Sequence, residues 1–306
     1  PSPRRRVTGR ITGTTAPARG QFSTAASSDR CDASANRPTI LTLFHTSPAD
    51  GNGHAASSRT HLICYLNRMD NKQDIDEILT HWPFDPMSVN VRMLETAQRE
   101  ILQMRTDMGV LQLEIEGRPD GNRPHGSATY FEFLKKKAVE SREFELDEDS
   151  CLEIDREFVQ FYHRRVCWLQ LKKFDRAVSD ADHTLQLMDF CKEFSPDDQW
   201  TISHEQYRPF VLYHRTQAAA LAHIDAGDDD AAHRAIDEVN NGLERMRSLF
   251  VEYEAEEQYE EDELVQRLIE FREGLREKYE VGRTTIEQLA DAIASEDYEL
   301  AAALRD

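Results

Sequence analysis

A short repeat in the middle of the chain sets the tightest limit on how it can fold. The triplet Tyr162-His163-Arg164 returns 51 positions later as Tyr213-His214-Arg215. Each triplet opens an apolar stretch with helical spacing, and each is followed by a short turn and a second helix that starts near an alanine. Helical pairs of this kind bury their apolar faces by stacking on one another. We therefore expect an all-α fold with a helical repeat core over residues 150–245.

The first repeat unit resembles a tetratricopeptide (TPR) helical hairpin. The stretch KKFDRAVSDADHTLQL is similar to the second half of the TPR consensus, and the apolar spacing agrees at Trp168, Leu171, Phe174, Ala177, Val178, Ala181, Leu185 and Leu187. The second unit matches less well, because Asp229 stands where the family has an aromatic residue and an insertion covers residues 193–208. The resemblance implies a degenerate TPR-like pair with a concave surface for peptides or protein termini. Its candidate partner-binding residues are Tyr162, Arg164, Tyr213 and Arg215.

The C-terminal residues 284–306 contain a second helical pattern. Ile286, Leu289, Ala292 and Ile293 recur at steps of three and four, which places them on one face of a short helix. Ser295 is an N-cap type of residue, and the acidic residues after it suit the positive end of a second helix. Two helices this short bury too little surface to be stable alone. The hairpin therefore needs either the rest of the chain or a partner.

This C-terminal stretch resembles the UVR motif shared by the UvrB/UvrC proteins. The matching positions are Leu289, Ala292, Ile293, Asp297, Tyr298, Glu299, Ala301, Ala302, Leu304, Arg305 and Asp306. In the families that carry it, the motif is a two-helix hairpin that docks onto a partner protein and catalyses nothing. The resemblance implies a partner-binding site made of Leu289, Ile293, Tyr298, Ala302, Leu304 and Arg305.

An acidic helical arm is predicted between the repeat core and this hairpin, over residues 246–283. Glutamate is crowded between positions 252 and 263, and a stripe at helical spacing follows, made of Leu264, Leu268, Phe271, Leu275 and Tyr279. The stripe is expected to pack on the body of the protein or in a coiled-coil pair. The arm is expected to hold the UVR-like hairpin away from the body.

An N-terminal helical segment is predicted over residues 71–145. A short helix is expected around Ile75 and Leu79, and a long amphipathic helix over Val91 to Ile115. The turn sequence that starts with Gly117 then ends this helix and carries Arg118 and Arg123, which are candidate anion-binding residues. Because no strand is expected before the turn and no Walker pattern follows, a rigid interhelical loop is the favoured interpretation.

Charge is distributed unevenly along the chain. The first 68 residues hold nine arginines and three acidic residues, a local charge of +6, so the remaining 238 residues carry −26. Residues 1–70 are rich in Arg, Ser and Thr and are expected to be disordered. The acidic remainder repels phosphate backbones, which argues against direct binding of nucleic acid by the body of the protein.

No pattern points to catalysis or to a bound cofactor. The sequence lacks HExxH, GxSxG, SxxK and His/Cys zinc spacings, so no catalytic residue, metal ligand or cofactor is predicted. The five cysteines are an odd number without CxxC spacing, which favours free thiols and a cytoplasmic location. No run of about 18 apolar residues exists, so no membrane span is expected.

These features together predict a non-enzymatic adaptor or scaffold that binds a protein partner. By resemblance, the partner could belong to nucleotide excision repair, to a Clp-type protease or to a protein-arginine-kinase system. The first alternative is a structural homo-oligomer, for example a homodimer, that assembles through the C-terminal helices. The second is a nucleic-acid-associated factor that uses the basic tail and the loop at Arg118 and Arg123.

Overall fold

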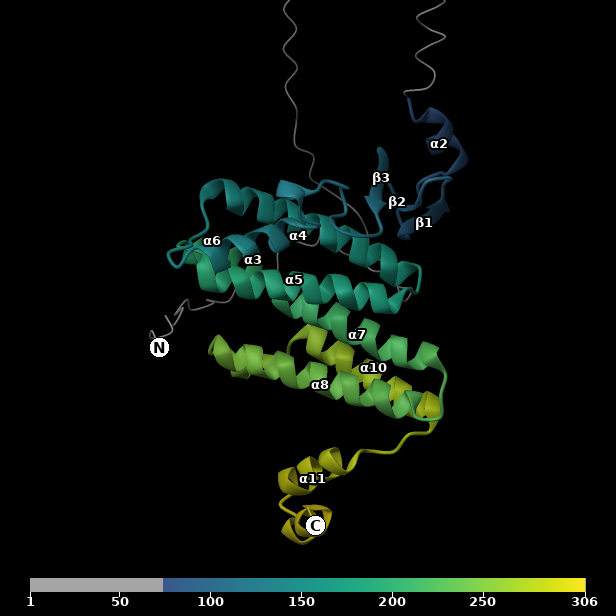
Figure 1. The fold of residues 1–306 in the computed structure, drawn as a ribbon. Helices are drawn as coiled ribbons and strands as arrows, with labels where there is room; N and C mark the ends of the chain where they lie inside the picture. The colour runs from purple at the N-terminus through teal and green to yellow at the C-terminus, as the bar shows by residue number, and fades with distance from the viewer. Residues whose placement is uncertain (1–73, 306) are drawn as a thin grey trace, which may run out of the picture. The chain divides into compact units, whose positions relative to one another are not determined.

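The computed structural model describes residues 74–305, so the tail predicted to be disordered over residues 1–70 lies outside the described residues. The described chain forms two compact units, one made of residues 91–104 and 112–305 and the other of residues 74–90 and 105–111. Most of the described residues lie in helices, as predicted. One small sheet is the exception (Figure 1).

The sheet replaces the long amphipathic helix predicted for Val91 to Ile115, and that prediction is wrong. Three strands take its place in the order β1-β2-β3, with the bounds β1 Asn90–Glu95, β2 Glu100–Thr106 and β3 Gly109–Glu114. The turn at Thr96, whose hydroxyl accepts a hydrogen bond from the Arg99 backbone N–H at 3.0 Å, interrupts the helical register. A two-residue connection before Gly109 interrupts it again. Apolar residues at steps of three and four therefore belong to three separate strands.

The helices follow one another with short connections. Their bounds are α2 Asp76–His81, the 3-10 turn η1 Pro124–Gly126, α3 Tyr130–Glu140, α4 Glu148–Gln170, α5 Phe174–Phe194, α6 Asp198–Glu205, α7 Arg208–Ala226, α8 Ala231–Glu252, α9 Glu256–Tyr259, α10 Glu263–Tyr279, α11 Thr285–Ala294 and α12 Tyr298–Arg305. The short helix predicted around Ile75 and Leu79 is confirmed as α2. The insertion predicted between the two repeat units contains α6.

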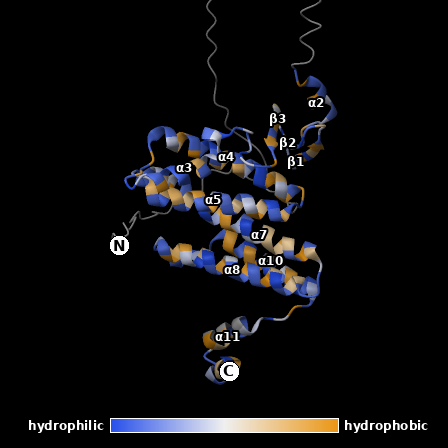
Figure 2. Ribbon diagram, viewed as in Figure 1, coloured by the Kyte–Doolittle hydropathy of each residue, from blue (hydrophilic) through white to orange (hydrophobic). Residues whose placement is uncertain are grey.

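Four long helices form the body of the larger unit. Helices α4 and α5 pair with each other, α5 packs on α7, and α7 pairs with α8, so that successive helices lie side by side in Figure 1. Each triplet of the repeat lies in the first helix of a pair, α4 or α7. Hydrophobic and hydrophilic residues alternate along these helices in Figure 2, as expected for helices with one buried face. The largest apolar core of α8 is shared with α7 and α10.

Acidic and hydroxyl side chains mark where several helices begin. The Asp147 carboxylate accepts a hydrogen bond from the Ser150 backbone N–H at 2.8 Å at the start of α4. Asp197 and Asp262 cap α6 and α10 in the same way. Glu157, which is fully buried in α4, accepts from the backbone N–H groups of Tyr130 and Phe131 in the first turn of α3. A carboxylate from one helix thus satisfies the free N–H groups of another.

Helices α7 and α8 approach each other most closely at Gly242. A Cβ atom at this position would lie 2.3 Å from both Cγ2 and Oγ1 of Thr216 on α7. Thr216 is fully buried, and its hydroxyl has no hydrogen-bond partner among the described residues. Only glycine leaves room for this contact, so the sequence at position 242 fixes the spacing between the two helices.

The acidic arm predicted for residues 246–283 folds back onto the body. Helix α10 packs against α8 and α7 and buries Val265, Leu268 and Leu275 in their shared core. Of the two predicted fates of the stripe, the structure shows packing on the body. Tyr259 holds the connection in place, because its hydroxyl donates to the Leu243 carbonyl at 3.1 Å. None of the helices between residues 74 and 305 has the length and apolarity needed to cross a membrane.

Candidate functional site

The C-terminal hairpin consists of α11 and α12, which contact each other directly. A capping box starts α11: the Thr284 side chain accepts from the Glu287 backbone N–H, and the Glu287 side chain accepts from the Thr284 backbone N–H at 2.8 Å. The turn between the helices passes through Glu296, whose φ of 58° is left-handed. Local hydrogen bonds therefore define both the start of the hairpin and its turn.

Helix α12 starts two residues later than the cap predicted at Ser295. The Asp297 carboxylate accepts a hydrogen bond from the Leu300 backbone N–H at 3.1 Å, which is the bond expected of an N-cap. Ser295 instead ends α11, where its hydroxyl donates to the Asp291 carbonyl at 2.8 Å. The prediction of a serine cap is wrong, because a serine that can bond back to the last turn of α11 serves that helix.

The predicted partner-binding residues of the hairpin divide into two sets. Leu289 and Leu304 are half-buried and lie around Ala292, which is only 2% exposed. By contrast, Ile293 is 55% and Tyr298 68% exposed, and Ala302 and Arg305 are also exposed. The first set packs within the protein, while the second set faces solvent and is free to contact another molecule.

Leu300 belongs to the exposed set but was not among the predicted site residues. It is 46% exposed and follows Tyr298 by two positions. The motif resemblance passed over it because it is not one of the matching positions. Its signal in the sequence was only that a large apolar residue lies between Glu299 and Ala301 in a strongly polar segment. We call Ile293, Tyr298 and Leu300 together the hairpin patch.

Acidic side chains surround the hairpin patch. Glu296, Asp297 and Glu299 are exposed and lie between or beside the patch residues in the chain. Residues 284–305 contain five acidic residues and one arginine, a net charge of −4. No salt bridge within the described residues involves Glu296 or Glu299. The hairpin patch is therefore an apolar surface with a rim of available carboxylates.

The start of the hairpin is joined to the end of α10 by an ion pair. The Glu287 carboxylate binds the Arg276 guanidinium, and Arg272 lies 3.5 Å from it. Burial opposes the charge of Glu287, but hydrogen bonds from Thr284 and Arg276 outweigh burial and lower its pKa. Glu287 therefore serves both as the capping residue of α11 and as its tie to α10.

The triplet residues of the first repeat unit make internal contacts. Arg164 is buried, and its guanidinium donates to both carboxylate oxygens of Asp180 on α5, at 2.9 and 2.7 Å. It also donates to the backbone carbonyls of Glu114 and Gly117, at 3.1 and 2.8 Å. Tyr162 is half-buried, and burial raises its pKa to about 12. Arg164 faces the interior, so its predicted role in binding a partner finds no support in this arrangement.

The second triplet is bound in a similar way. Arg215 is half-buried and donates to Asp182 on α5 at 3.0 Å and to Glu238 on α8. Tyr213 is also half-buried, and burial raises its pKa. Between the triplets, His214 is buried and its Nδ1 lies 3.4 Å from the Arg165 Nε. Burial and the Arg165 charge lower the pKa of His214 to about 3, so its ring is neutral at pH 7.

Arg118, one of the two candidate anion-binding residues, is already surrounded by acidic groups. It is buried, donates to Glu153 at 2.9 Å and to Gln160 at 3.2 Å, and lies 3.6 Å from both Asp120 and Glu157. These carboxylates neutralise its charge, so an anion-binding role finds no support in this geometry.

Arg123, the other candidate, is exposed at the far end of the loop. The loop also directly follows strand β3, which contradicts the prediction that no strand precedes it.

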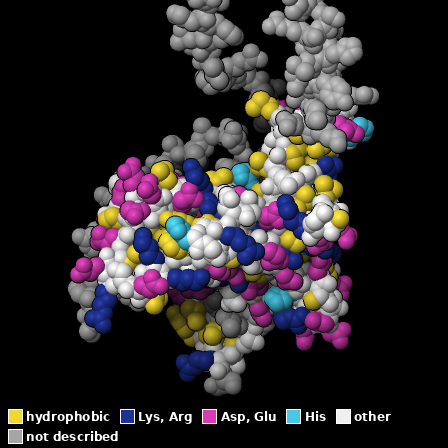
Figure 3. All heavy atoms as spheres, turned by 45° about the horizontal axis from the view of Figure 1, so that its top comes forward, with side chains coloured by type: hydrophobic (Ala, Val, Ile, Leu, Met, Phe, Trp, Pro, Cys, Tyr) yellow, Lys and Arg dark blue, Asp and Glu magenta, His cyan; other side chains and the backbone are white. Residues whose placement is uncertain are grey.

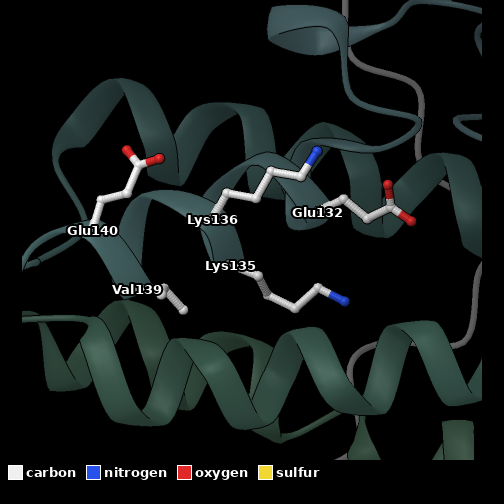
Figure 4. Close-up of a pocket in the computed structure, with 5 residues that line it drawn as sticks. All are labelled: Glu132, Lys135, Lys136, Val139 and Glu140. Carbon is white, nitrogen blue, oxygen red and sulfur yellow. The ribbon is translucent and has the colours of Figure 1, made fainter.

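A shallow depression on α3 does not collect the groups that a ligand site needs. It is lined by Glu132, Lys135, Lys136, Val139 and Glu140, which all lie on one helix (Figure 4). Its charged groups have opposite signs and no second element closes over them. In the part of the chain that the structure describes, no group of three or more His, Cys, Asp or Glu side chains could hold a metal ion. On the face seen in Figure 3, acidic and basic side chains are intermingled.

No protein-family model, no curated protein and no solved structure matches the chain. The site must therefore be argued from its own residues. Among the described residues, the hairpin patch combines large exposed apolar side chains with a local acidic rim, and it is the candidate functional site.

Proposed function

We propose that this protein is a non-enzymatic adaptor that docks a partner protein through the hairpin patch. The observation that carries the proposal is the exposure of Ile293, Tyr298 and Leu300 within eight consecutive residues. Full burial of one large apolar side chain is worth about 1.5–3 kcal/mol. Three such side chains, each about half exposed, can supply several kcal/mol when a partner covers them, as interface hot spots do.

The arrangement of the rest of the chain supports a display role. The four long helices and α10 bury their own apolar faces, and the stripe of α10 packs internally. A body of this kind is self-sufficient, whereas a pair of helices of ten and eight residues is marginal by itself. The hairpin therefore gains most from a partner.

The sequence resemblances agree with this function. The C-terminal hairpin resembles the UVR motif, and by that resemblance the partner belongs to nucleotide excision repair, to Clp-type proteolysis or to a protein-arginine-kinase system. The paired helices α4-α5 and α7-α8 resemble a degenerate TPR pair, which would add a second binding surface at Tyr162 and Tyr213. The described cysteines are free thiols, consistent with the cytoplasmic location that we propose.

The predicted alternatives have less support from the geometry. A homo-oligomer through the stripe of α10 would need Leu268 and Leu275, but both are buried against the protein's own core. A nucleic-acid factor would need a free basic loop, but Arg118 pairs with carboxylates. Self-association through the hairpin alone stays as the alternative that must be tested.

The test uses the exchange of two exposed apolar residues for acids. Tyr298 and Leu300 lie in the first turn of α12, where an aspartate suits the positive helix end, so Tyr298→Asp with Leu300→Asp should leave the fold intact. The matched control is Val139→Asp with Val251→Asp, which alters two exposed apolar residues elsewhere. Equal thermal unfolding curves by circular dichroism would confirm that both variants fold.

Affinity capture from native lysate, read by mass spectrometry, then compares the three proteins. We expect at least one protein to be captured by the wild type and by the control but not by the hairpin variant. Identical capture by all three would overturn the proposed docking role.

A further inference from the structure

We infer that the partner segment received by the hairpin patch is a cationic amphipathic helix of another protein. This inference rests on the proposed docking function and adds the chemistry of the partner. It follows from the charges around the patch and from the shape of the exposed surface.

The rim of the hairpin patch selects the sign of the partner's charge. Glu296 and Glu299 are exposed and have no salt bridge within the described residues, and Asp297 is exposed although one of its oxygens caps α12. A partner that covers Tyr298 would place its own polar groups against these three carboxylates. Lysine or arginine at those positions gains from the contact, whereas acidic groups are repelled.

The same charges argue against a second copy of this chain as the occupant. Two hairpins facing each other would bring together two surfaces that each carry −4 over residues 284–305. The whole chain carries −20, so long-range repulsion opposes self-association as well. The two nearby arginines are not free to compensate, because Arg283 pairs with Asp291 and Arg276 pairs with Glu287.

The layout of the patch selects a helical partner. Ile293 lies near the end of α11, while Tyr298 and Leu300 lie in the first turn of α12, so the apolar residues are grouped at the turn of the hairpin. No strand occurs in residues 284–305, so this region has no sheet edge to which a partner strand could be added. An amphipathic helix can instead place its apolar stripe over the three residues and its basic flanks over the rim.

Two synthetic peptides serve as probes for the full-length chain. Each is about 18 residues long, which is enough for a helix to form on binding. Both carry the same leucine stripe at steps of three and four, and they differ only in having lysine or glutamate among the remaining positions. Binding is measured by fluorescence anisotropy of the labelled peptides at low and at physiological ionic strength.

Three protein variants locate the contact. The hairpin variant Tyr298→Asp with Leu300→Asp removes the apolar contact. The rim variant Glu296→Gln with Glu299→Gln removes two charges and keeps the Asp297 cap. The matched control is Glu256→Gln with Glu257→Gln, which removes two charges from another exposed acidic segment of the chain.

We expect the lysine peptide to bind the wild type and the control equally, and the glutamate peptide not to bind. The rim variant should weaken binding of the lysine peptide about fivefold, as expected for two exposed charge pairs. The hairpin variant should abolish it. Equal weakening by the rim variant and the control would show that the peptide binds acidic surfaces generally, and this would overturn the inference.

Failure of the inference can be told apart from failure of the docking function. If sedimentation shows that the wild type self-associates and that the hairpin variant does not, the occupant is a second copy. That result overturns the cationic partner and leaves the docking role of the patch intact. If the lysate experiment shows identical capture by all proteins, both proposals fall together.

Discussion

Gly242 offers the sharpest test of the helical packing, because its replacement should have the opposite sign from a glycine replacement elsewhere in the same protein. The change Gly242→Ala would place a methyl group 2.3 Å from two atoms of Thr216. Overpacking of a tight core costs about 1–3 kcal/mol, while the higher helix propensity of alanine returns about 1 kcal/mol. We expect the free energy of unfolding to fall by up to about 2 kcal/mol.

The matched control is Gly274→Ala in α10. Gly274 is exposed, lies inside a helix, and has no atom within 4 Å of the position that a Cβ would take. Alanine should therefore raise the free energy of unfolding by about 0.5–1 kcal/mol through helix propensity and backbone entropy alone. Urea unfolding followed by circular dichroism measures both variants against the wild type.

A compensating change closes the argument. Thr216→Ala removes the two atoms at 2.3 Å, although the remaining Cβ stays 2.8 Å from the added methyl group. The double variant should thus be more stable than the sum of the single changes predicts, by about 1 kcal/mol. A Gly242→Ala protein as stable as the Gly274→Ala protein would refute the close approach of α7 and α8.

Three further outcomes follow from other contacts. Replacing Arg164 by alanine leaves Asp180 buried without its partner, which should cost about 3–5 kcal/mol in urea unfolding; a loss below about 1 kcal/mol would show that Asp180 finds other partners. The lowered pKa of His214 means that the unfolded chain binds a proton that the folded chain refuses, so stability is full above pH 6.5 and falls as the pH drops toward 3. Between pH 7 and pH 5 the loss from this group is about 1–2 kcal/mol, and His214→Gln should remove that part of the slope; an unchanged slope would show that His214 can be protonated in the folded state. Thr284→Ala removes the capping box of α11 and should lower the local stability by about 1 kcal/mol, read as faster amide hydrogen exchange in α11 with unchanged exchange in α8; unchanged exchange in α11 would contradict the cap.

The helices of the body could be read from the sequence because their signals are local. Both Tyr-His-Arg triplets lie in helices, and the turn at Gly227 between α7 and α8 shows the left-handed φ of 69° that glycine readily adopts. Composition and spacing within about 15 residues are enough for such elements. The resemblance to a TPR pair goes further than these local signals and stays a prediction.

The sheet could not be read from the sequence in the same way. Leu102 and Leu113 are buried in a core with Trp168, which lies on α4 more than fifty positions away. The segment that contains Leu102 satisfies a helical period as well as a strand period, and the contact with Trp168 decides between them. Tertiary contacts of this range override local propensity.

Within the candidate site, sequence reasoning found the hairpin but not which of its residues face outward. Leu289 and Leu304 were expected to contact a partner, yet they are half-buried, while Leu300 is exposed and was missed. A two-helix element has faces only a few residues wide, so a shift of two positions in the helix start, from Ser295 to Asp297, changes which residues are presented.

The contacts of Arg164 limit how the loop after β3 can change. One guanidinium binds a carboxylate on α5 and two backbone carbonyls on either side of residues 115–116. Surface loops ordinarily tolerate added or deleted residues. Here a single insertion would move one carbonyl away from the buried charge and leave it partly unsatisfied. The length of this loop is therefore as constrained as the identity of a core residue.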